Sequence, residues 1–71
     1  MTPEARIEQA FTALPADLLD RLLALDDATA HAVHNRATRR LLGVARAEGP
    51  LAIAPAAVRI VETTLADALA R

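Results

Sequence analysis

The 71-residue chain contains no Cys, Ser, Lys, Tyr or Trp, and Phe11 is its single Phe. Without Cys it has neither disulfides nor thiolate metal ligands. Without Ser, Cys, Lys and Tyr it lacks most side chains that act as covalent nucleophiles. These absences exclude Ser-His-Asp and Cys-His hydrolysis and a serine-carried phosphopantetheine arm.

Glycine is also scarce, since only Gly43 and Gly49 occur. The chain therefore has no glycine-rich loop to hold phosphates, and it has no P-loop lysine. A helical chain of this length also has little room for an enclosed, water-excluding pocket. We predict that the protein is not an enzyme, and we expect no cofactor.

No stretch of 18 consecutive apolar residues is present, so we expect no transmembrane helix and no membrane partner. Residues 1–4 lack the basic start and apolar stretch of a signal peptide, and the expected compartment is the cytoplasm. The net charge of −1 creates no overall field toward nucleic acid or anionic lipid. Alanine richness, with Arg in place of every Lys, suggests a GC-rich bacterial genome.

Helix-forming residues are abundant, because Ala and Leu dominate the chain. β-branched residues are few and scattered, which argues against a sheet. We predict an all-α fold, a small three- or four-helix bundle with short loops, as one domain over residues 1–71. The expected helices cover residues 3–14, 15–25, 28–47 and 55–70. The sequence leaves open whether the second and third form one continuous rod.

Three of these helices have apolar residues at spacings of three and four, which defines one buried face each. The expected face of the first helix is Ile7, Ala10, Phe11 and Leu14, that of the third is Ala30, Val33, Ala37, Leu41 and Val44, and that of the fourth is Val58, Val61, Leu65 and Leu69.

The second helix has too many leucines for one buried face. They span roughly 160° of its circumference, whereas a helix at the edge of a bundle needs about 100°. Leu42 and Ile60 also lie off the expected faces of their helices. We therefore predict an interface formed by Leu19, Leu23, Leu42 and Ile60. The leading hypothesis is a non-enzymatic protein–protein interaction module, a small bacterial adaptor, assembly or regulatory protein, that forms an isologous homodimer.

An alternative function follows from the distribution of charge. Residues 28–47 carry four Arg and no acid, whereas residues 1–27 carry six acids and two Arg. Three of the Arg residues, Arg36, Arg39 and Arg46, are expected opposite the apolar face of the third helix. The basic set could bind phosphates or meet the acidic half of the chain. Its members, with one from the fourth helix, are Arg36, Arg39, Arg40, Arg46 and Arg59.

The region around Gly49 and residues 53–59 loosely resembles the turn and second helix of a helix-turn-helix motif, although three extra residues lie between Gly49 and Val58. The alternative hypothesis is therefore a small helix-turn-helix-like regulator that binds nucleic acid through these Arg residues.

A minor alternative is metal binding by Asp27, His31 and His34. These residues follow one another at i, i+4 and i+7, so on one helix they share a flank. Two imidazoles and a carboxylate can bind Zn²⁺ or another transition metal. No matching ligand pair occurs elsewhere in the sequence. The simpler interpretation is that Asp27 caps the helix and both His lie at the margin of the bundle.

Overall fold

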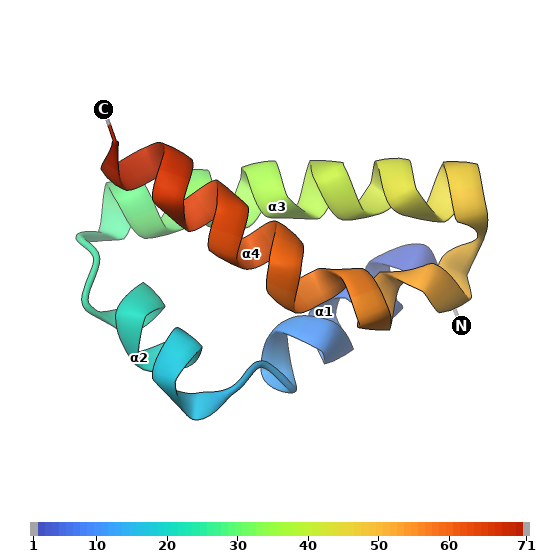
Figure 1. Ribbon diagram of the computed structural model, residues 1–71, viewed down its shortest axis with the longest axis horizontal. Coiled ribbons are helices and arrows are strands. Elements are labelled where there is room, and N and C mark those ends of the chain that lie inside the picture. The colour runs from blue at the N-terminus through green and yellow to red at the C-terminus, as the bar shows by residue number, and fades with distance from the viewer. Residues whose placement is uncertain (1, 71) are drawn as a thin grey trace.

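A computed structural model of the chain describes residues 2–70 and confirms an all-α fold (Figure 1). Four α-helices follow one another, α1 (Pro3–Thr12), α2 (Ala16–Leu23), α3 (Asp27–Glu48) and α4 (Ile53–Leu69), with one 3-10 turn, η1 (Pro50–Ala52), between the last two. No strand is present in residues 2–70. None of the helices in that range combines the length and apolarity needed to cross a bilayer.

The first and third helices begin at side-chain caps. The Thr2 hydroxyl accepts from the Ala5 amide at 3.2 Å, and Asp26 Oδ2 accepts from the Thr29 amide at 3.1 Å. Such caps satisfy amides that have no partner within the helix. Because Asp26 caps a new helix, α2 and α3 are separate elements divided by residues 24–26.

The same cap changes the acidity of Asp26. Thr29 holds the pKa of Asp26 below its ordinary value of 3.8, through its side chain first and then through its backbone amide. These hydrogen bonds favour the charged carboxylate, which is the better acceptor at the positive end of α3.

The connection between α3 and α4 depends on Gly49, whose φ of 92° and ψ of 161° lie in a region that only glycine readily adopts. Pro50 then begins η1, which continues directly into α4 at Ile53. The fourth helix therefore starts at Ile53. The sequence predicted its start two residues later, at Pro55. A proline in the first turn is tolerated because its missing amide has no partner there.

The helices α3 and α4 form an antiparallel hairpin, and α1 packs against both (Figure 1). The hydrophobic core lies where these three helices meet. Its fully buried side chains include Ile7 of α1, Leu41 of α3, and Ile53, Val61 and Leu65 of α4.

α2 is attached more weakly than the other helices. It has eight residues, no side-chain hydrogen bond at its N-cap, and Leu18 as its single buried residue. Leu19, Leu22 and Leu25 are half-buried against the core. Because a helix this short is not stable alone in water, it depends on these leucines.

The buried face of α4 differs from the predicted one. Val61 and Leu65 are buried as expected, but Val58 and Leu69 are exposed by 36% and 61%. The buried arc is rotated by roughly a quarter turn and contains Ile53, Ala56, Ala57, Ile60, Val61, Thr64 and Leu65. The arc is wide because α4 packs against α1 and α3 together. Alanine and threonine, which the hydrophobic pattern disregarded, form much of it.

Candidate interaction surface

An apolar groove opens between α2, the first half of α3 and the last turns of α4. It consists of two hollows that share Val33 as a lining residue. Val33 is only 2% exposed, yet it lies outside the main core cluster. The groove is therefore a second apolar region, next to the core and open to solvent.

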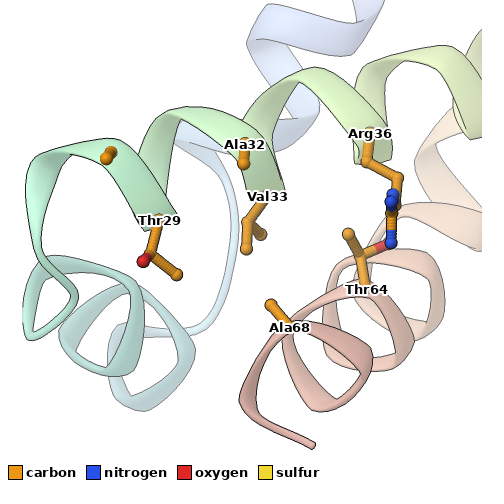
Figure 2. A pocket seen from close by; sticks show the side chains of 7 residues that line it. Thr29, Ala32, Val33, Arg36, Thr64 and Ala68 are labelled. Atoms are coloured by element: carbon orange, nitrogen blue, oxygen red, sulfur yellow. The ribbon is translucent and has the colours of Figure 1, made fainter. Parts of the chain in front are cut away.

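The first hollow, between α3 and α4, has a volume of about 300 Å³ and is lined mainly by small side chains (Figure 2). Thr29 and Val33 point from α3 toward Ala68 on α4 (Figure 2). Arg36 extends from α3 toward Thr64 and bounds the opposite end of the hollow (Figure 2). The result is an apolar depression with one cationic side chain at its edge.

The second hollow, between α2 and α3, has a volume of about 470 Å³. Leu22 and Leu23 line it from α2, and Ala30 and His34 line it from α3. Phe11 of α1 also contributes, and its ring lies 4.6 Å from the ring of His34, with 32° between the two planes. This tilted ring pair connects α1 to α3 beside α2.

Several large apolar side chains remain exposed, and one of them, Leu23, lines the groove. Leu23, on α2, is 81% exposed, and Leu69, next to Ala68 on α4, is 61% exposed. Leu51 of η1 is 74% exposed, but it lines a different depression with Arg6 and Ala54. Large apolar residues around a hollow are typical of surfaces that bind another protein.

The four residues predicted at an interface occupy different environments. Leu23 lies in the groove, whereas Leu19 and Leu42 are half-buried against the core. The exposure predicted for Ile60 is wrong, because Ile60 is 8% exposed and belongs to the core. Because α4 packs against both α1 and α3, the side of α4 opposite its predicted buried face is covered as well. Leu69, predicted in the buried face of the fourth helix, is exposed instead, and so is Leu51, which lies outside the predicted helices.

The predicted arginine cluster is divided between two environments. Arg39 and Arg46 are exposed, as predicted from their position opposite the apolar face of the third helix, and Arg59 is exposed as well. Arg36 is half-buried beside α4 and is therefore not opposite the buried face.

Arg40 is part of the packing between α3 and α4. Its Nη1 donates to the Thr64 hydroxyl at 2.9 Å, and its Nη2 lies 3.0 Å from Asp67 Oδ2. Arg40 therefore has anionic and hydroxyl partners within the chain and does not extend freely into solvent.

The antiparallel course of α3 and α4 differs from a helix-turn-helix, whose helices cross at about 90–120°. Thr29, near the start of α3, and Ala68, near the end of α4, line the same hollow. The two helices therefore lie side by side along most of their length, and neither projects as a separate recognition helix.

The predicted metal ligands do not gather into a site. Asp27, His31 and His34 line the second hollow together with apolar side chains. Within residues 2–70, however, no group of three His, Cys, Asp or Glu residues has a spacing that could hold a metal ion.

Comparison with known proteins gives no family model, no curated protein and no solved structure that matches this chain. Function is therefore inferred from the groove and the charges around it.

Proposed function

We propose that this chain is a non-enzymatic protein–protein interaction module that associates with itself through the apolar groove. The observation that carries the proposal is Leu23, which is 81% exposed beside a hollow of about 470 Å³. Burying a leucine side chain contributes about 1.5–3 kcal/mol. A leucine held in water next to an apolar hollow therefore favours a bound state that covers both.

The total surface area supports the same proposal. The chain exposes 4625 Å², against roughly 4,200 Å² expected for a compact protein of 7.5 kDa. Covering the groove would also stabilise α2, which buries only Leu18 by itself.

The test compares two leucines that are exposed to a similar extent. Leu23→Asp places a charge in the groove, and Leu51→Asp places the same charge on η1, outside it. We expect Leu23→Asp to abolish self-association in sedimentation-velocity experiments, and Leu51→Asp to leave it unchanged. Circular dichroism of both variants verifies that the helices remain. Equal effects of the two substitutions, or none, would contradict the proposal.

Phosphate binding by the outer surface of α3 is the second candidate. Arg39 and Arg46 are two turns apart and exposed, and no ion pair engages either of them within residues 2–70. Such binding weakens steeply between about 50 and 200 mM salt. Fluorescence anisotropy with a random DNA duplex at low salt tests it, with Arg39→Gln/Arg46→Gln as the matched variant. If the anisotropy of the duplex does not change when the unmodified chain is added at low salt, this candidate is excluded.

A further inference from the structure

We infer that the groove binds α2 of a second copy of this chain, so that two copies exchange Leu23 side chains around a two-fold axis. The inference rests on the proposed self-association and specifies its geometry. Two features of the surface lead to it, an apolar side chain flanked by acids and an apolar hollow flanked by an arginine.

The first feature is Leu23 with its acidic neighbours. Asp20 lies one turn before Leu23 on the same face of α2, and both residues are exposed. Asp27, at the start of α3, lines the same hollow as Leu23 and is also exposed. A partner that covers Leu23 therefore meets carboxylates next to it, and positive charge on the partner at that place favours binding.

The second feature is the hollow between α3 and α4 (Figure 2). Its volume of about 300 Å³ leaves ample room for a leucine side chain, and its lining of alanine, threonine and Val33 is mainly apolar. Arg36 lies at its edge and takes part in no ion pair within the described range 2–70. The hollow therefore complements Leu23 in polarity and Asp20 in charge.

These two features cannot satisfy each other within one chain. Leu23 lines the hollow on the α2 side of Val33, and Arg36 lines the hollow on the α4 side. Leu23 remains 81% exposed in this arrangement. Since every copy carries both features, a two-fold axis places each Leu23 in the other copy's hollow and each Asp20 near the other copy's Arg36. An isologous dimer forms both contacts twice and closes on itself.

A stable dimer requires a minimum area of contact on each copy. A dimer of standard size covers about 800 Å² on each copy, which is roughly a sixth of the 4625 Å² that one copy exposes.

Charge reversal tests the geometry directly. Arg36→Glu places like charges opposite Asp20 in a homodimer, and Asp20→Arg does the same opposite Arg36. We expect each variant alone to dimerise at least about tenfold more weakly than the unmodified chain. An equimolar mixture of the two variants should recover affinity. In the mixed dimer Asp20 of one copy faces Arg36 of the other, and the two introduced side chains, which also have opposite charges, face each other.

The outcomes separate this inference from the proposed function. If the unmodified chain is monomeric, both fail. If it dimerises while the charge variants behave like the unmodified chain, or while the mixture does not recover affinity, the exchange of α2 is overturned and self-association stands.

A crosslinking experiment keeps the test independent of the stability of Arg36→Glu. The chain has no cysteine, so single cysteines can be introduced without background. Asp20→Cys in one copy and Ala32→Cys in a second copy of different mass should be joined by a short bismaleimide, because Ala32 is exposed and lines the hollow. Leu51→Cys paired with Ala32→Cys is the control. Equal yields from the two pairs would refute the geometry.

Discussion

Thr64, on the buried face of α4, accepts a hydrogen bond from Arg40 Nη1 at 2.9 Å and donates one to the Ile60 carbonyl at 2.7 Å. Its hydroxyl is thus satisfied twice, although the residue is 1% exposed. The half-buried Thr38 of α3 presents the opposite situation, because its buried hydroxyl has no hydrogen-bond partner within the described chain.

The same substitution should therefore have different effects at these two positions. Thr64→Val removes the hydroxyl that Arg40 contacts and should lower the free energy of unfolding by about 1–2 kcal/mol. Thr38→Val removes a hydroxyl without a partner and should leave stability unchanged or raise it by up to about 1 kcal/mol. Urea denaturation of both variants measures the difference. A greater loss at Thr38 would contradict the hydrogen-bond assignment.

The two glycines form a second matched pair. Gly49→Ala requires a non-glycine residue at φ 92° and should destabilise the protein by about 1–3 kcal/mol. Gly43 is an exposed residue inside α3 with open space around it, so Gly43→Ala should stabilise the helix by up to about 1 kcal/mol. Thermal unfolding followed by circular dichroism measures both shifts. Shifts of the same sign would be inconsistent with this description of the α3–α4 connection.

Asp26 should make stability depend on acid pH. Its pKa is lowered in the folded chain from 3.8, so the charged carboxylate contributes stability above that pH. The contribution is lost as the pH falls through the folded-state pKa. Asp26→Asn retains a capping oxygen without the charge. We expect the Tm difference between the unmodified chain and Asp26→Asn to decrease from about pH 6 to about pH 2.5. A difference that is constant over this range would show that the charge has no role.

The overall class of fold was accessible from sequence because it depends on features that act locally. Caps such as Thr2, the helix-forming composition and the break at Gly49 determine where helices begin and end. The buried direction of α4 was not accessible in this way. It depends on α1, which is distant in sequence and covers the side containing Ile60, and on Arg40, whose hydrogen bond allows Thr64 to be buried.

The sequence predicted an interface but no groove, and Leu23 alone among the four predicted interface residues lines it. The excess of leucine in residues 15–25 correctly indicated that α2 carries apolar area beyond one buried face, and Leu23 is exposed. The hollow between α3 and α4 was missed because alanine and threonine line most of it, and these residues give no strong hydrophobic signal. The hollow forms only where α3 and α4 pack side by side, so the pattern of one helix alone cannot predict it.

The central claim is that this chain covers its groove with a second copy of itself. Sedimentation equilibrium of the unmodified protein, from about 1 µM to about 1 mM, tests it most directly because the range spans strong to weak association. We predict a molar mass that rises with concentration from one to two chains of 7.5 kDa. A mass of one chain at every concentration would contradict the claim.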